Sequence, residues 1–205
     1  MATEGKLYLY SFWLRIWHAV NALGIILLII SGLSMQFSEF WSSILNFETA
    51  VNLHNILGIT ISISYLLFFF GNMFSGNKKY YRIKPKGLRK RLLKQAKYYL
   101  FGMFKGQVAP FPISEKRKFN PLQKYSYVVV MYFFVPLIII TGIALLFPEI
   151  IIEDIYSISG ISLTALSHAI LGFLISIFLF IHIYVASIGK SPINNFRSII
   201  TGWHS

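Results

Sequence analysis

The sequence has no cysteine and little charge. None of its 205 residues is a cysteine, which excludes thiolate-bound iron–sulfur clusters, thioether-linked c-type haem, disulfides and a cysteine nucleophile. Charged residues make up 13% of the chain and hydrophobic residues 56%, so the charged coat of a soluble domain cannot be formed. A metal centre would have to use histidine, carboxylate or methionine, and we expect the chain to face lipid.

The apolar residues form long blocks. A bilayer core needs roughly 20 apolar residues in a helix, and four segments of the chain meet this requirement. The first of them is too long for the core of a signal peptide, so we interpret it as a retained helix. Pro136 lies inside the third segment and should kink it. The fold class is therefore predicted as all-α, a transmembrane four-helix bundle forming a single domain over residues 1–205, with spans at about 13–37, 54–74, 125–147 and 162–188.

Positive charges occur in three parts of the chain. They lie near the N-terminus (Lys6, Arg15), in and beside the connection 75–124, and in the tail (Lys190, Arg197). The connections 38–53 and 148–161 contain acidic residues and neither lysine nor arginine. The positive-inside rule then predicts that both termini and the long basic loop are cytoplasmic and that the two short acidic connections face outward.

The basic loop carries more positive charge than the whole chain's formal charge of +12, because the rest of the chain is slightly acidic. Its apolar residues between 88 and 104 could line one face of a surface helix on anionic membrane lipids. A docked cytoplasmic protein is the main alternative. Basic residues interleaved with tyrosines can also bind RNA, but between two membrane spans we expect no nucleic-acid partner.

Four of the five histidines lie in the predicted spans, where an ionisable residue is costly and indicates function. His18 lies about one turn inside the cytoplasmic start of the first span, and His54 opens the second span at the outer side. In the fourth span His168 is near the outer start, and His182 follows fourteen residues later, about 21 Å along the helix and on nearly the same face. Depth therefore pairs His54 with His168 and His18 with His182.

A small residue follows each of these histidines by four positions. One turn along the same face, it would leave room for a flat macrocycle, although small residues also permit close helix packing without a cofactor. The strings H54-N-I-L-G58 and H168-A-I-L-G172 look like one element used twice. The four small residues are Ala22, Gly58, Gly172 and Ala186.

The cofactor that suits such pairs is haem b. Two imidazoles without a carboxylate or thiolate do not complete a tetrahedral zinc site, whereas a porphyrin supplies four nitrogens and needs two axial ligands. For any single histidine, a hydrogen bond between helices is the alternative. Arg15, one turn before His18, is a candidate partner for a propionate of the inner haem or, equally, a positive anchor. His204 is expected to be a solvated tail residue.

These features resemble the cytochrome b subunits of respiratory formate dehydrogenases, membrane-bound nickel–iron hydrogenases and thiosulfate reductases, the bacterial b561-like group. The resemblance covers nearly the whole chain, and its most specific element is the histidine pair fourteen residues apart in the fourth span. It implies two haem b groups, an outer one on His54 and His168 and an inner one on His18 and His182. The other matching strings are R15-I-W-H18, H54-N-I-L-G58 and F119-N-P-L-Q-K124.

The resemblance also implies a quinone site beside the inner haem, at Asn120 and Gln123 next to Lys124. Some members of the group have small residues between the asparagine and the glutamine, whereas this chain has Pro121 and Leu122. From the residues alone, Asn120-Pro121 could instead be just a helix start with proline at the first helical position. The quinone would be menaquinone or ubiquinone.

The implied function is electron transfer in the bacterial cytoplasmic membrane, as one subunit of an oxidoreductase. An outside-facing iron–sulfur or multihaem cytochrome subunit, of a hydrogenase, formate dehydrogenase or similar complex, would deliver electrons that reduce quinone near the cytoplasmic face. With a thiosulfate-type partner the subunit would oxidise quinol instead. A self-contained quinone-linked oxidoreductase for a small molecule such as superoxide is a second hypothesis. A transporter with histidine proton relays, which predicts broken helices at mid-membrane, is a third.

Overall fold

The structure, a computed structural model, describes residues 7–41, 45–188 and 192–204 and is mostly helical. Lys6 and Lys190, on which part of the predicted orientation rests, lie outside the described residues. Four helical stretches are long and apolar enough to cross a membrane, which confirms the four predicted spans. They are α1 (Phe12–Gln36), α3 (Phe47–Phe74), the continuous run of α6 (Pro121–Val129), η3 (Val130–Phe134) and α7 (Val135–Leu146), and α8 (Gly160–Ser187).

Two spans begin earlier than their apolar blocks predicted. Helix α3 begins at Phe47, where the Asn46 side chain accepts a hydrogen bond of 2.9 Å from the Thr49 backbone N–H. The third span begins at Pro121, after Asn120 as N-cap. In both cases an asparagine satisfies a free backbone N–H group, so the helix extends into polar sequence that hydropathy alone does not identify. His54 is consequently two turns inside α3.

Near Pro136, where the sequence predicts a kink, the helix changes from α to π and back to α. The five residues of η3 form a π-helix, and α7 begins at Val135 with Pro136 in its first turn. Proline has no backbone N–H and cannot complete the regular α-helical pattern, and a single π-helical turn is a common way for a long helix to absorb such a defect.

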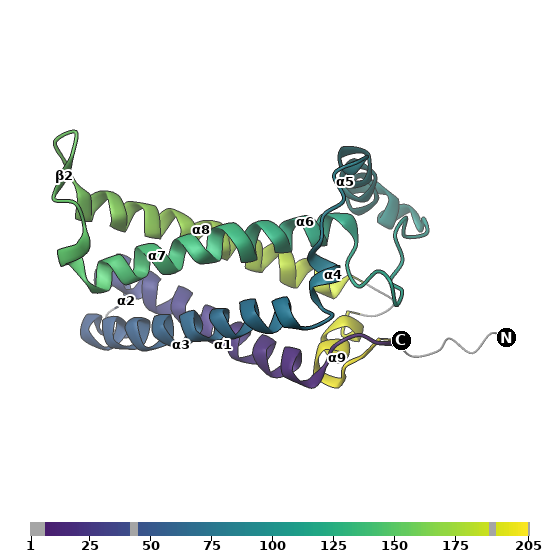
Figure 1. The fold of residues 1–205 in the computed structure, drawn as a ribbon, viewed down its shortest axis with the longest axis horizontal. Coiled ribbons are helices and arrows are strands. Elements are labelled where there is room, and N and C mark those ends of the chain that lie inside the picture. Colours follow the sequence, from purple (N-terminus) through teal and green to yellow (C-terminus); the bar gives the residue numbers. More distant parts are fainter. Residues whose placement is uncertain (1–6, 42–44, 189–191, 205) are drawn as a thin grey trace.

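The four spans form two antiparallel helical hairpins, because α1 packs on α3 and α7 packs on α8, with α3 also touching α7. Figure 1 shows α2 (Ser38–Trp41) and the hairpin of β2 (Asp154–Ile155) and β3 (Ile158–Ser159) at one end of the bundle. Helices α4 (Lys78–Tyr81), α5 (Leu88–Lys97) and α9 (Asn194–Thr201) lie at the opposite end. The short and the long connections are thus at opposite ends, as the charge pattern predicted.

The two described ends of the chain meet at the end that carries α4, α5 and α9. Strand β1 (Leu7–Tyr8) pairs antiparallel with β4 (Trp203–His204). His204 is half-buried, and its Nδ1 lies 3.3 Å from Ser198 Oγ. The expectation of a solvated tail histidine was therefore wrong, because strand pairing holds the tail against the N-terminal segment.

Much of the connection between α3 and α6 is helical. After α4 and α5, the chain continues through a π-helix, η1 (Tyr98–Gly102), and a 3₁₀-helix, η2 (Met103–Lys105). Helical structure therefore runs from Leu88 to Lys105, in agreement with the helix expected over residues 88–104, and its contact with lipid stays a prediction.

An apolar layer occupies the middle of the bundle. Val130, Val135 and Ile175 are buried there. Ile25 of α1, Tyr65 of α3 and Phe178 of α8 pack around them. Ile175 is seven residues from each of the two histidines of α8, so this layer lies at a depth between them.

Candidate functional site

The structure brings the four histidines together in the two expected couples. At the end of the bundle near β2 and β3, the rings of His54 on α3 and His168 on α8 have their centres 6.2 Å apart. Toward the other end, the rings of His18 on α1 and His182 on α8 are also 6.2 Å apart. We call these the outer and the inner couple. Each couple joins helices of different hairpins, and all four side chains are half-buried.

A hydroxyl group fixes the orientation of each ring in the outer couple. Ser31 Oγ lies 3.0 Å from His54 Nδ1 and 2.8 Å from the Leu27 carbonyl oxygen. A carbonyl cannot donate, so the serine hydroxyl donates to it, and the serine oxygen accepts from the Nδ1–H of His54. The proton of His54 is then on Nδ1, and the lone pair of Nε2 is available to a metal.

Thr141 repeats this arrangement for His168. Its Oγ1 lies 3.0 Å from the Leu137 carbonyl oxygen and 2.9 Å from His168 Nδ1. The same reasoning places the proton of His168 on Nδ1. Ser31 is on α1 and Thr141 on α7, so each outer histidine is held by the other helix of its own hairpin.

Glycines make room for the outer rings. A Cβ atom on Gly32 would lie 3.4 Å from His54 Cε1, and one on Gly142 would lie 3.1 Å from His168 Cε1. Each of these glycines directly follows the supporting hydroxyl residue. In each Ser/Thr-Gly dipeptide the hydroxyl therefore hydrogen-bonds the ring, and the glycine leaves space for it. On the histidine helix itself, a Cβ on Gly58 would have no atom within 4 Å. This open space agrees with the predicted room for a macrocycle.

The inner couple has a different environment. His182 Nδ1 lies 3.3 Å from the hydroxyl of Tyr127 on α6. The Phe178 ring stacks on the His182 ring at 5.7 Å and 16°. The Tyr127 hydroxyl can either donate or accept here, so it does not fix the tautomer in the way that Ser31 and Thr141 do.

Arg15 lies one turn before His18, as predicted, and part of it lacks a partner. Within the described residues, its Nε atom is buried without a hydrogen-bond acceptor. Its guanidinium also lies over the Phe12 ring, at 5.7 Å. A buried donor of this kind is costly unless an anionic or polar group completes it. A carboxylate such as a haem propionate is a suitable acceptor.

Asn120 and Gln123, the predicted quinone contacts, form the capping box of α6. The Asn120 side chain accepts from the Gln123 backbone N–H at 2.9 Å, and Gln123 Oε1 accepts from the Asn120 backbone N–H at 3.2 Å. Asn120 Nδ2 also donates to the Tyr99 hydroxyl at 2.7 Å. Both residues therefore have the structural role that the Asn-Pro sequence allowed, and their contact with quinone stays a prediction.

A buried lysine lies just before this helix start. Lys118 is only 4% exposed, and its Nζ lies 4.3 Å from the centre of the Tyr10 ring, 5.5 Å from that of Tyr80 and 5.8 Å from that of Phe119. Burial lowers the pKa of Lys118 to about 8 and raises the pKa of Tyr10 to about 12. The aromatic faces partly replace the water that the ammonium group loses.

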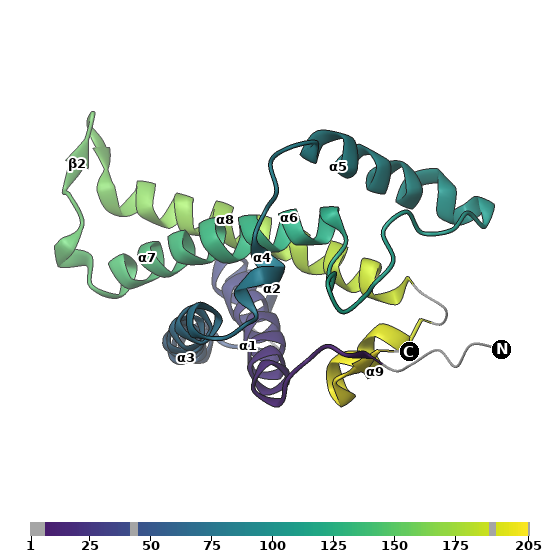
Figure 2. The ribbon, with the colours of Figure 1, turned by 45° about the vertical axis from the view of Figure 1, so that its right-hand side comes forward.

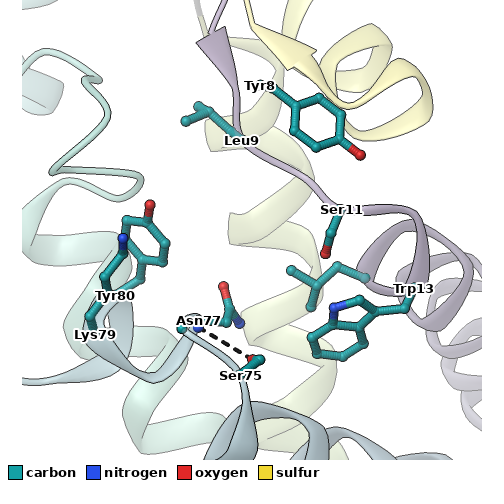
Figure 3. Close-up of a pocket in the computed structure, with 10 residues that line it drawn as sticks. Tyr8, Leu9, Ser11, Trp13, Ser75, Asn77, Lys79 and Tyr80 are labelled. Atoms are coloured by element: carbon teal, nitrogen blue, oxygen red, sulfur yellow. Dashed lines mark hydrogen bonds between the residues drawn. The ribbon is translucent and has the colours of Figure 1, made fainter.

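Two pockets lie near the ends of the bundle. One, of about 320 Å³, is lined by the first turn of α1 and the junction of α3 with α4, where Figure 3 shows Ser11, Trp13 and Asn77 around it. There the Asn77 backbone N–H donates to Ser75 Oγ at 3.3 Å. The other, of about 370 Å³, contains Thr141 and Ser167 but is lined mostly by isoleucine, leucine and alanine. Neither pocket is lined by the four histidines. The second pocket, which contains Thr141 and Ser167, has few polar groups to hold a small polar substrate.

The geometry of both couples fits a haem with two axial imidazoles. With metal–nitrogen bonds of about 2 Å and roughly another 1.2 Å from each nitrogen to its ring centre, two imidazoles on opposite sides of a metal have centres about 6 Å apart. Both couples match this distance. Among the described residues, no group of three or more His, Asp or Glu side chains could hold a metal, so each couple offers two ligands, the number that a porphyrin iron requires.

Sequence reasoning identified the histidines but missed Ser31, Thr141 and Tyr127. A signal for the first two exists, because the string L27-L-I-I-S31-G32 recurs as L137-I-I-I-T141-G142. Together with the repeated H-x-I-L-G strings, it shows that the outer couple is built from one helical-hairpin pattern used twice. Tyr127 has no such signal.

Comparisons with known proteins cover nearly the whole chain. The sequence matches the family described as prokaryotic cytochrome b561 over residues 9–202, which include all four histidines of the couples. It is also similar to the putative cytochrome YdhU of Escherichia coli (strain K12), with 36% identity over 200 residues. That match covers 97% of this chain and 75% of the relative.

Proposed function

The chain belongs to the prokaryotic cytochrome b561 family, and from this premise we propose that it is a di-haem membrane subunit linking an outside-facing redox partner to the quinone pool. Membership in the family, together with the four apolar spans, makes it an integral membrane electron-transfer protein that binds haem b. The proposal adds the number of haems, their ligands, the quinone and the direction across the membrane.

One observation carries the proposal: two histidine couples, both 6.2 Å between ring centres, lie at different depths of one bundle. His54 and His168 would hold the outer haem, and His18 and His182 the inner one. Haem b, when bound, supplies one-electron transfer, and two axial histidines leave the iron no open position for oxygen chemistry.

Other residues would set the conditions at each site. Ser31 and Thr141 bind Nδ1 of the outer imidazoles, so Nε2 of each would be free to ligate the iron. The Arg15 guanidinium would donate to a haem propionate, its missing partner, beside the inner couple. The apolar layer around Val130, Val135 and Ile175 keeps water out of the middle of the bundle. The protein thus contributes ligation, spacing and a low dielectric constant.

The sidedness of the proposal rests on charge. The end that carries the described termini, α4 and α5 also carries the basic residues, so the positive-inside rule makes it the cytoplasmic side of a bacterial inner membrane. The opposite end carries Glu39, Glu149, Glu153 and Asp154, which would face a partner subunit outside. Quinone would then react at the inner end, near Asn120 and Gln123, with the basic connection as its cytoplasmic border.

The quinone assignment can be separated from helix capping by one conservative change. Asn120→Ser keeps an N-cap oxygen for the Gln123 backbone N–H but removes the side-chain NH₂ group. With dithionite-reduced protein in detergent, we expect reoxidation by a menaquinone analogue to slow by about five- to tenfold, the effect of one lost hydrogen bond. The haem spectrum should stay near that of the unchanged protein, whereas the melting temperature should fall slightly because the hydrogen bond to the Tyr99 hydroxyl is lost. A Tyr99→Phe protein, which loses the same bond but keeps the Asn120 amide, should react with quinone at the full rate.

A control on the other asparagine cap, Asn46→Ser, changes the start of α3 in the same way at the outer end of the bundle. Its reoxidation rate should match that of the unchanged protein. An Asn120→Ser protein that reacts with quinone at the full rate would remove Asn120 from the quinone site while leaving the haem assignment intact.

A further inference from the structure

An apolar stripe on the α5–η2 segment (Leu88–Lys105) has no partner among the described residues. Leu93 is 60% exposed, Leu100 65% and Phe104 73%, with Phe101 beside them at 58%. Spacings of seven, eight and eleven residues place these side chains on one face of a helix. They lie along one side of the segment over about three turns, with the exposed Lys97 between Leu93 and Leu100.

The opposite face of the segment packs on the bundle. Gln95 is only 2% exposed, Leu88 and Leu92 are half-buried, and α5 contacts α6. From η1, the Tyr99 hydroxyl accepts the hydrogen bond from Asn120 at the start of α6. These contacts fix the rotation of the segment, so the apolar stripe points away from α6.

Basic side chains surround the stripe. Residues 75–114 contain eleven lysines and arginines and no acidic residue. Arg89, Lys90 and Lys97 share the exposed face with the stripe, and Lys94 and Lys105 lie beside it. An exposed apolar face bordered by one sign of charge is the composition of a helix that lies in the interface of an anionic membrane.

The direction of α5 agrees with such a position. Figure 1 looks nearly along the axis of α5 while the four spans run across the picture, and Figure 2 shows the same helix from the side. Helix α5 therefore crosses the direction of the spans at one end of the bundle. Since the spans cross the membrane, α5 runs parallel to the membrane plane.

We propose that the α5–η2 segment lies on an anionic phospholipid surface, with Leu93, Leu100, Phe101 and Phe104 among the acyl chains and the basic side chains at the lipid phosphates. Charge complementarity selects this occupant. A basic partner surface would be repelled, and a neutral apolar partner would leave the lysines without counter-charges. Anionic phospholipids supply acyl chains for the apolar stripe and phosphates for the basic side chains.

The chain has no cysteine, so a single introduced cysteine can carry an environment-sensitive fluorophore. Full-length Leu100→Cys protein, labelled with NBD, is placed in nanodiscs of phosphatidylcholine alone or of equal parts phosphatidylcholine and phosphatidylglycerol. A doxyl-labelled lipid should quench the label, by about twofold more in the anionic discs, and high salt should reduce the difference. Phe104→Cys should behave alike, so the result does not depend on one variant.

Ser114→Cys is the matched control, because Ser114 is exposed in the same connection but off the stripe. Its label should stay in a water-like environment in both lipids. Adding Lys94→Gln and Lys97→Gln to the Leu100→Cys protein should reduce the preference for anionic discs. An unquenched, water-like label at Leu100 and Phe104 in both disc types would overturn the proposal and leave the stripe open to a protein partner. The haem spectrum reports that each variant is folded.

Discussion

The outer and inner couples have the same ring separation but are supported in different ways. In the outer couple, each imidazole donates to a hydroxyl whose own proton is bound by a carbonyl of its helix. In the inner couple, His182 has the Tyr127 hydroxyl and the stacked Phe178 ring, and a buried arginine nitrogen lies one turn from His18.

The difference indicates two ways to orient a histidine ring for binding a metal. The outer rings are held by helix backbone through short side chains, so their tautomer and rotation follow from the fold itself. The inner rings depend on larger side chains and on charge at the end of the bundle where quinone is proposed to react. We therefore expect the outer site to respond to small steric and hydrogen-bond changes and the inner site to respond to changes of charge.

The largest effect should come from the histidines themselves. His168→Ala should remove the outer haem and His182→Ala the inner one, each lowering the reduced-minus-oxidised haem absorbance of purified protein to about half. His204→Ala, a histidine outside both couples, should keep the full absorbance. Loss of both haems from each single variant would show that the two couples do not bind independently, and the comparison between them would fail.

A large side chain at Gly58 should mainly affect the outer haem. Gly58→Leu meets no protein atom within 4 Å of its Cβ, so a loss of haem would report a macrocycle in that space. We expect a severalfold lower occupancy of the outer haem, measured as haem per protein, with the inner haem retained. Gly76→Leu also has open space around its Cβ but lies outside the spans, and it should bind haem normally. Equal occupancy in both variants would place the macrocycle elsewhere.

Removal of the outer hydroxyls should shift the outer haem alone. Thr141→Val keeps the shape of the side chain but removes the hydroxyl that accepts from His168 Nδ1–H, which makes the imidazole a weaker donor to iron. The outer haem should bind about 10- to 100-fold more weakly, and its midpoint potential should rise in a redox titration. Ser31→Ala should act in the same direction through His54.

Ser34→Ala is the control for these hydroxyl variants. Like Ser31, Ser34 is a fully buried serine of α1 that donates to a carbonyl of its own helix, but its contact is with Ile30. Its outer-haem potential should be unchanged. A shift of the same size in Ser34→Ala would mean that the effect comes from α1 packing and not from the imidazole.

Loss of the Arg15 charge should lower the midpoint potential of the inner haem, whereas loss of the outer hydroxyls should raise that of the outer haem. Arg15→Gln removes a positive charge that would favour the reduced haem, so the inner midpoint potential should fall, by on the order of 50 mV for a change of about 1 kcal/mol. Arg15→Lys keeps the charge and should recover most of the difference. An unchanged inner potential in Arg15→Gln would assign Arg15 to membrane anchoring.

The sequence predicted the features that depend on one helix at a time. Apolar length located the spans, and the fourteen-residue spacing placed His168 and His182 on one face of α8. The contacts of Ser31 with His54 and of Thr141 with His168 could not be predicted in this way, because they depend on the rotation of one helix against its neighbour. A serine that bonds its own preceding turn also looks unremarkable in a membrane span, and only its repeat as Thr141-Gly142 indicates a role.

The central claim is that each couple holds one haem b, and the haem content of the purified full-length protein tests it most directly. A pyridine haemochrome assay against protein measured by amino-acid analysis should give two haem b per chain. A ratio of one would mean that one of the two couples is a hydrogen-bonding arrangement within the bundle. A chain that folds in the membrane without any haem would contradict the account altogether.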